Sequence, residues 1–437
     1  MLKESLAFSK IVQIFIIIYL ASSLLYATLH LLGFGWFQNL SIVATTAKDK
    51  SALLDNPLTS RSEPITVSQL HKRYHSSQTV IWSNAEGGQT QTIPENLIVG
   101  KVFADAMGPS KVIPYYFRAS EHFEQEDITI ATLVTHNRFP VLSRLASRYK
   151  GPISVAIHVN DDSTKGTILK DLHNIYEENP DVRKYVDIHL VVDKFDRQFN
   201  MWRNVAKFFT RTDYLMMLDV DFHLCTDFRE SLKKHEDLME RLRSGRAAVV
   251  VPAFEYIAEE DGEDWRLFPK DKEALMNIVL TEEIDMFHLN WTRGHGSTDY
   301  KKWYRSSQPY KVTDYNYSYE PYVIYKKEGT PWCEERFVGY GANKAACLYE
   351  IYLAGIDYWV LPDDFLIHQT HHYPEETRAK ERKYNKKLYE YFREEVCLRY
   401  SRLMISAGLW DTDIADNLKK ECAKITGYRE VVSKIQQ

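Results

Sequence analysis

Short apolar segments alternate with helix-like segments from about residue 127 to residue 254, and this alternation constrains the fold most strongly. Strands separated by helices usually form a mostly parallel sheet with helices on both faces. The expected strands are residues 127–135, 152–159, 185–193, 213–219 and 247–254, and the expected helices run up to residue 149 and over 169–178, 200–209 and 227–242. The sequence therefore predicts an α/β domain whose ligand site lies beyond the C-terminal ends of the strands.

The N-terminal region predicts a membrane anchor. Residues 11–34 are nearly all apolar, and a helix of that length spans about 36 Å, enough to cross a bilayer. Lys3 and Lys10 precede the span and the next Lys or Arg is Lys48, so the positive-inside rule favours a cytosolic N-terminus. A buried core helix is the alternative, but the segment lacks a polar face. The predicted organisation is a cytosolic tail (1–10), a signal-anchor (11–34), a polar stem (35–95) and a catalytic domain (96–430).

Composition disfavours several classes of function for this protein. The chain has 55 Lys and Arg against 60 Asp and Glu, a net charge of −5, which disfavours nucleic-acid binding. Its five cysteines include no CxxC pair, so neither a zinc knuckle nor a dense disulfide framework is expected. The pairing of the cysteines stays open, and at least one must be unpaired. Three N-x-S/T sequons, at Asn39, Asn290 and Asn316, fit exposure in the secretory lumen.

Two carboxylates follow an apolar strand. Asp219 and Asp221 stand where the segment DYLMML ends, and paired carboxylates there can hold a divalent cation that bridges nucleotide phosphates. The triplet at 411–413 has the same form, but it lies in a polar C-terminal stretch. His368 ends a second apolar strand, with two more histidines at 371 and 372. Histidine is a common metal ligand, so His368 is a candidate third ligand. Capping of a neighbouring loop is the alternative role for Asp219.

Three further segments contain candidate site residues. Asn200 and Arg203 open a predicted helix, where Asn200 is either a ligand contact or an N-cap, and Arg203 faces either an anion or solvent. Gly339 and Gly341 precede a helix expected near residue 343, and they let the backbone approach a ligand closely. Acids just before that loop, at 334 and 335, are either a general base or favourable charges at a helix N-terminus.

Several stretches in the same order carry a resemblance to one family. They are FNMWRNVAKFF, YLMMLDVDF, VVVPAFE, FPKDKEAL, GHGSTDYKKWY, YEPYV, RFVGYGANK and VLPDDFLIH, spread between residues 127 and 400. On these the chain resembles glycosyltransferase family 49, which includes LARGE-type and β-1,4-glucuronyltransferase-like enzymes. The resemblance implies a GT-A fold, meaning a Rossmann-like, mostly parallel twisted sheet flanked by helices. It also implies an inverting transfer from a UDP-sugar with Mn²⁺, Mg²⁺ being possible. Glu334 stands where the family often has Asp, and Ala342 where its residue is often bulkier.

The resemblance and the residue patterns together define a complete predicted site. The predicted general base is Glu334 or Glu335, the donor contacts are Thr135, Arg138, Asn200, Arg203, Asp219, His295, Gly339 and Gly341, and the metal ligands are Asp219, Asp221 and His368. Characterised relatives use UDP-glucuronate, and Arg203 and His295 can pair with its carboxylate. The predicted protein is a single-pass type II Golgi enzyme that glycosylates a glycan or glycoprotein in the lumen.

Two other classes stay open. A metal-dependent hydrolase would use the same two aspartates together with His368, His371 and His372. A catalytically inactive sugar-binding or scaffolding homologue is suggested by the departures at Glu334 and Ala342. Binding of UDP that strengthens with Mn²⁺ would favour the transferase over a plain sugar-binding protein.

Overall fold

The computed structural model describes residues 79–83, 90–94, 110–195, 197–371 and 375–436. Residues 79–94 hold an antiparallel pair, β1 (Thr79–Ser83) and β2 (Thr90–Pro94), within the segment predicted as a stem. The predicted anchor at 11–34 and the sequon at Asn39 lie outside the described residues. Within the described ranges, no helix combines the length and the apolar character needed to cross a membrane.

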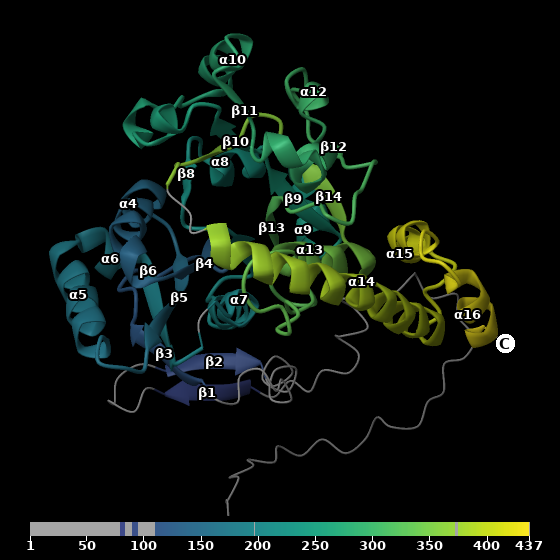
Figure 1. The fold of residues 1–437 in the computed structure, drawn as a ribbon, viewed down its shortest axis with the longest axis horizontal. Helices are drawn as coiled ribbons and strands as arrows, with labels where there is room; N and C mark the ends of the chain where they lie inside the picture. The colour runs from purple at the N-terminus through teal and green to yellow at the C-terminus, as the bar shows by residue number, and fades with distance from the viewer. Residues whose placement is uncertain (1–78, 84–89, 95–109, 196, 372–374, 437) are drawn as a thin grey trace, which may run out of the picture. The chain divides into compact units, whose positions relative to one another are not determined.

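The main sheet has nine strands in the order β12-β14-β9-β13-β7-β4-β5-β6-β3 (Figure 1). Its parallel centre consists of β4 with β5 and β7 on either side, and β6 beyond β5. These strands and β9 are the five that the sequence predicts: β4 (Ile128–Val134), β5 (Ile153–Asn160), β6 (Val186–Asp193), β7 (Tyr214–Met217) and β9 (Ala247–Val251). The α/β prediction is therefore confirmed.

The sheet is mixed rather than wholly parallel. β13 (Tyr322–Lys326) lies antiparallel between β7 and β9, and β3 (Lys111–Phe117) is antiparallel to β6 at one edge. β14 (Asp357–Val360) pairs in parallel with β9, and β12 (Tyr310–Lys311) covers the other edge. Residues 255–335, which follow the predicted alternation, therefore supply a strand of the main sheet. The alternation of strands and helices does not reveal this YVIYK strand, because no helix lies between β12 and β13.

Helices cover both faces of this sheet, and each face has its own hydrophobic core. One core contains residues of α7 (Phe199–Phe208), α13 (Asn343–Leu353) and α14 (Glu375–Ser406). The other contains residues of α4 (Phe139–Tyr149), α5 (Lys165–Glu178), α6 (Pro180–Tyr185), α8 (Phe228–Lys233) and α9 (Glu236–Arg243). The single helix predicted over 227–242 is thus two helices. Neighbouring strand residues such as Met216 and Met217 contribute to opposite cores, as the two-residue period of a strand requires.

A second, four-stranded sheet has the order β11-β10-β15-β8. Its strands are β8 (Phe222–Leu224), β10 (Ala253–Tyr256), β11 (Ile284–Met286) and β15 (Leu366–His368). β8 and β15 are antiparallel, with Phe222 opposite His368. This pairing brings His368, at the end of β15, next to the start of β8, which Asp221 immediately precedes.

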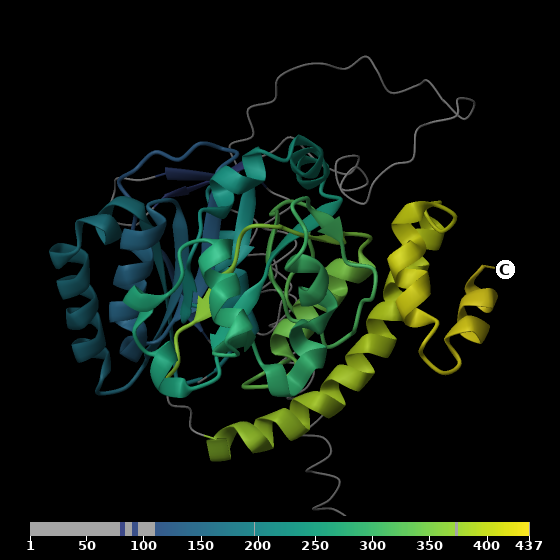
Figure 2. The ribbon, with the colours of Figure 1, turned by 90° about the horizontal axis from the view of Figure 1, so that it is seen from above.

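The remaining helices are α10 (Lys272–Leu280), α11 (Thr292–His295), α12 (Tyr300–Trp303), α15 (Asp416–Cys422) and α16 (Tyr428–Ile435). α14 is the longest helix drawn, and both views show it running past α13 (Figures 1 and 2). Cys397 on α14 forms a disulfide with Cys422 on α15, and Cys333 forms one with Cys347 on α13. Cys225 is buried and free, as an odd number of cysteines requires.

Candidate active site

The connection from β7 to β8 carries both predicted metal-binding acids. β7 ends at Met217 and β8 begins at Phe222, so Asp219 and Asp221 lie where the chain leaves the main sheet for the second one. The Asp219 side chain is 32% exposed and the Asp221 side chain 22% exposed. Both carboxylates therefore have solvent access, and a ligand can approach them.

Asp219 lies between two basic side chains. Arg203 Nη2 is 3.3 Å from one carboxylate oxygen, and Lys344 Nζ is 3.2 Å from the other. The Tyr322 hydroxyl donates to the same oxygen as Lys344, at 2.9 Å, and Lys344 Nζ lies 3.8 Å from the centre of the Tyr322 ring. Burial raises the pKa of Asp219, but Lys344 and Arg203 outweigh it, so its net pKa lies well below the usual range. Asp219 is therefore ionised.

Asp221 has its own two partners. Arg138 Nε lies 3.2 Å from one carboxylate oxygen, and His371 Nε2 lies 3.1 Å from the other. The ring of His368 lies 5.5 Å from the ring of His371, measured between centroids. Burial lowers the pKa of His368 to about 3, so its imidazole is neutral at neutral pH. The structure thus brings Arg138, Asp221 and His368 to one place.

The donor set has the chemistry of a divalent-cation site. Two carboxylates supply hard oxygen ligands, and the ring of His368 or His371 supplies nitrogen, a combination that suits Mn²⁺. Basic side chains occupy the carboxylate oxygens instead, and no three His, Cys, Asp or Glu side chains converge on one point anywhere in the described ranges. A cation held here would take over oxygens that Lys344, Arg203 and Arg138 now contact.

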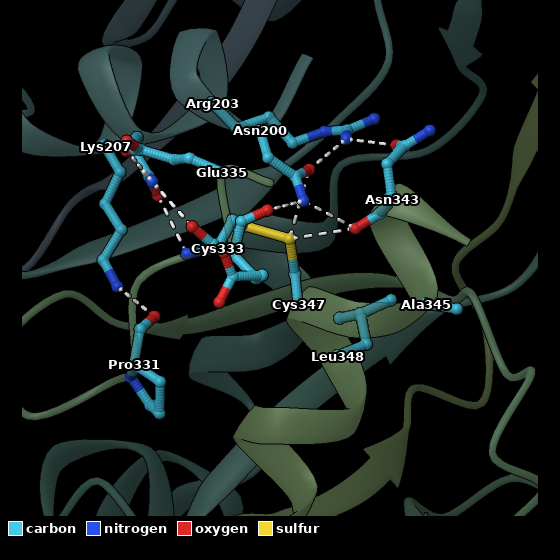
Figure 3. Close-up of a disulfide and its surroundings, with 12 residues drawn as sticks. Asn200, Arg203, Lys207, Pro331, Cys333, Glu335, Asn343, Ala345, Cys347 and Leu348 are labelled. Carbon is cyan, nitrogen blue, oxygen red and sulfur yellow. Dashed lines mark hydrogen bonds between the residues drawn. A yellow bond between two sulfur atoms is a disulfide. The ribbon is translucent and has the colours of Figure 1, made fainter. Parts of the chain in front are cut away.

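Asn200 joins two helices through the hydrogen bonds drawn in Figure 3. It is fully buried, and its amide donates to the carbonyls of Glu334 and Asn343, at 2.8 and 2.9 Å. Arg203 donates to the side-chain oxygens of both Asn200 and Asn343, at 2.9 and 2.6 Å. The N-cap of α7 is Gln198, so the N-cap reading of Asn200 is wrong. Asn200 instead fixes α7 to the first residue of α13, and this places Arg203 beside Asp219.

The two predicted bases already have strong partners. Arg336 contacts both carboxylate oxygens of Glu334, each at 3.0 Å, and also donates to Glu395 on α14. Burial raises the pKa of Glu334, but the hydrogen bonds from Arg336 outweigh it, so the pKa of Glu334 lies below its usual range. Glu335 is buried and accepts a hydrogen bond from Asn204 at 2.5 Å. These hydrogen bonds connect Glu335 to α7, and they connect Glu334 through Arg336 to α14.

The paired glycines make a close approach to α14. Both have positive φ, 79° at Gly339 and 93° at Gly341, a region that glycine adopts without strain. A β-carbon on Gly339 would lie 2.3 Å from the carboxyl carbon of Glu381. A carboxylate oxygen of Glu381 also accepts a hydrogen bond from the Tyr340 N–H at 2.9 Å. A β-carbon on Gly341 would lie 3.0 Å from the Arg382 backbone. The close neighbour of this loop is therefore a protein helix, and its contact with a donor stays a prediction.

His295 and Thr135, the remaining predicted donor contacts, differ in burial. His295 is buried, with its ring stacked 6.2 Å from the Tyr322 ring. Burial, reinforced by Lys344, lowers its pKa well below the usual value, so His295 is neutral. Thr135 is partly exposed and donates to the Asn137 side chain at 2.7 Å, one turn before Arg138.

Comparison with known proteins identifies the family. A family model described as a glycosyl-transferase for dystroglycan, glycosyltransferase family 49, matches residues 127–199 and 193–401. The chain belongs to this family.

Curated relatives support the assignment. The xylosyl- and glucuronyltransferase LARGE2s of Danio rerio is 32% identical over 264 residues, which cover 59% of this chain and 33% of that protein. The xylosyl- and glucuronyltransferase LARGE1 of Homo sapiens is 30% identical over 57% of this chain and 33% of its own length. This chain thus spans about a third of the length of these relatives. A crystal structure of GalNAc-T7 with UDP, GalNAc and Mn²⁺ aligns with a TM-score of 0.38 at 11% identity. The alignment covers 71% of this chain and 55% of that chain. This similarity is too distant to assign a fold.

Three polar residues at the site of this family 49 protein were not assigned from the sequence. Lys344 and Tyr322 contact Asp219, and Glu320 lies two residues before Tyr322. All three belong to stretches that carry the family resemblance, YEPYV and RFVGYGANK. The ordered motifs mark these stretches, but spacing along the chain does not show that Tyr322 and Lys344 reach Asp219.

Proposed function

We propose that this chain is a metal-dependent glycosyltransferase that moves a sugar from a UDP-sugar to a hydroxyl group of a glycan. The main support is the group of acids and bases at the end of β7, in a chain of family 49. Asp219 and Asp221 can hold Mn²⁺ or Mg²⁺ together with His368, and the cation would neutralise the diphosphate of the leaving UDP. Arg203, Lys344 and Arg138 add positive charge beside the same oxygens.

Glucuronate is the proposed donor sugar. The relatives named above are xylosyl- and glucuronyltransferases, and glucuronate carries a carboxylate that matches the positive side chains. Three basic groups, on Arg138, Arg203 and Lys344, lie beside the two aspartates. A uronate carboxylate can pair with these groups, whereas the neutral xylose cannot.

The proposal extends to fold type, stereochemistry and location. A GT-A arrangement agrees with the parallel strands β4 to β7 and the acids after β7, and an inverting transfer follows the family resemblance. A type II Golgi placement follows the charge pattern around residues 11–34. The cation, the donor and this topology are each open to direct test.

Release of UDP tests the activity. The full-length chain, made in a eukaryotic host, is incubated with UDP-glucuronate, UDP-xylose, UDP-glucose or UDP-N-acetylgalactosamine and a panel of p-nitrophenyl glycosides. We expect UDP release from UDP-glucuronate that needs both an acceptor and Mn²⁺ and stops with EDTA. Turnover of p-nitrophenyl phosphate without an acceptor would support the hydrolase instead. Binding of sugars without UDP binding would support the inactive scaffold.

A further inference from the structure

Glu320 is an acid at the site to which the sequence assigned no role. It immediately precedes Pro321 and β13, and its side chain is partly exposed. Its backbone N–H donates to the Gly294 carbonyl at 2.7 Å, next to His295. Its carboxylate accepts a hydrogen bond from the N–H of Ala345, in the first turn of α13. Glu320 therefore connects the His295 segment with the N-terminus of α13.

The charges around Glu320 are those of the active site. The groups that act on it most are Lys344, Arg203 and Asp219, with the buried Tyr389 of α14 also facing it. Burial raises the pKa of Glu320, and this effect exceeds the lowering by Lys344 and Arg203. A carboxylate with a raised pKa holds a proton better than Glu334, whose pKa is lowered.

The first turn of α13 contains no acid of its own. Its residues Asn343, Lys344 and Ala345 include no carboxylate, so a catalytic acid or base beside this turn must come from another segment. Glu334 is held by Arg336, and Glu335 by Asn204. Glu320 reaches the same turn from the strand side, beside Asp219 and its partners.

We infer that Glu320 is the general base of the transfer. Its carboxylate takes the proton of the acceptor hydroxyl while the hydroxyl oxygen bonds to the anomeric carbon of the donor. The bond between that carbon and the phosphate oxygen breaks, and its electron pair leaves with UDP. The proton on Glu320 returns to solvent before the next turnover. This inference rests on the proposed glycosyl transfer.

Substitution of Glu320 in the full chain tests the inference. Glu320→Gln keeps the size of the side chain but removes the proton acceptor, so kcat for transfer should fall by about 10²–10⁴. UDP affinity in the presence of Mn²⁺ and the melting temperature should stay near wild type. Glu334→Gln should lose less activity. Glu390→Gln, an exposed change on α14, should lose none.

Each other outcome has a distinct meaning. A Glu320→Gln variant with near wild-type kcat, or with weakened UDP binding, overturns the inference. So does a larger kcat loss in Glu334→Gln. If Glu320→Gln does not fold, Glu320→Asp decides, because a shifted carboxylate should lower kcat without changing UDP affinity, and unchanged kcat overturns the inference. If the wild-type chain releases no UDP with any donor, the proposed function itself fails, and the inference fails with it.

Discussion

Two carboxylates at the end of β7 are each held by two basic side chains. Arg203 and Lys344 contact Asp219, while Arg138 and His371 contact Asp221. Charged partners of this kind cost energy to desolvate, and Lys344 and Arg203 keep Asp219 ionised. Asp219 also accepts from Tyr322, so Asp221 is the acid with fewer protein contacts. A change at Asp221 therefore separates a metal-binding role from a packing role more cleanly than a change at Asp219.

Asp221→Asn should abolish transfer and leave the fold intact. Loss of a charged oxygen ligand should weaken Mn²⁺ binding by more than the roughly 10–100-fold typical of outer-shell changes. Its ion pairs with Arg138 and His371 are partly exposed, so stability should change by about 1 kcal/mol at most. Asp411 belongs to the look-alike triplet and is 96% exposed, which makes Asp411→Asn the matched control. Wild-type turnover of Asp221→Asn at limiting Mn²⁺ would contradict the metal assignment.

At the scale of elements, two disulfides stabilise different parts of the helical layer. Each closes a short loop, of 14 residues for Cys333–Cys347 and 25 residues for Cys397–Cys422. Removing either by paired Ser substitutions should cost about 3 kcal/mol, measured by urea unfolding. Only loss of Cys333–Cys347 should also reduce transfer. Cys347 lies on α13, whose first residue Asn343 holds Asn200 (Figure 3). The next residue, Lys344, contacts Asp219. Equal activity losses in both double variants would show that α13 does not need its own disulfide.

The glycine loop before α13 offers a second test at this scale. Gly341→Ala introduces a β-carbon 3.0 Å from the Arg382 backbone, at a φ of 93° that costs alanine about 1–2 kcal/mol. We expect a lower melting temperature and a raised KM for the donor, since the loop leads directly into Asn343 and Lys344. Gly166→Ala on α5 is the control, because no atom lies within 4 Å of the added carbon. It should be neutral or slightly stabilising. An unchanged donor KM in Gly341→Ala would argue against a donor role for this loop.

At the scale of the whole molecule, buried neutral histidines make stability depend on pH. Burial lowers the pKa of His189 to about 3, while an unfolded histidine titrates near 6.5. Between these values the unfolded state binds more protons, so stability should fall as the pH falls from 6.5 towards 3. His189→Gln should be less stable at pH 7 but show a flatter slope between pH 6.5 and 5. The exposed His122→Gln should keep the wild-type slope. A wild-type slope in His189→Gln would contradict this explanation.

Glycosylation tests the predicted topology of the whole chain. Asn290 is exposed, whereas Asn316 is partly buried and its side chain accepts a hydrogen bond from the Ser318 N–H at 2.9 Å. A lumenal domain should therefore carry a glycan at Asn290 and little or none at Asn316. An endoglycosidase-sensitive gel shift that Asn290→Gln removes would agree with this. A reporter sequon placed before Lys3 should stay unmodified. A full-length chain without any glycan would contradict lumenal placement.

The sequence alone determined the parallel centre of the sheet and the position of the two aspartates of the site. Apolar strands alternating with helices are a local pattern, so β4, β5, β6, β7 and β9 were predictable, as was the position of Asp219 and Asp221 after β7. Resemblance to family 49 was likewise readable from ordered motifs. The same local patterns gave no reason to place β13 inside the sheet, since a lone five-residue strand does not specify its neighbours.

Only the tertiary structure decided which side chains meet at the site. Tyr322 and Lys344 lie more than a hundred residues after Arg203 in the sequence, yet all three contact Asp219. The predicted base Glu334 is held by Arg336, while the unassigned Glu320 lies among the charges of the site. Local sequence fixes which face of a strand or helix a residue occupies. Contacts between distant segments depend on how sheets and helices pack, and no local periodicity encodes that packing.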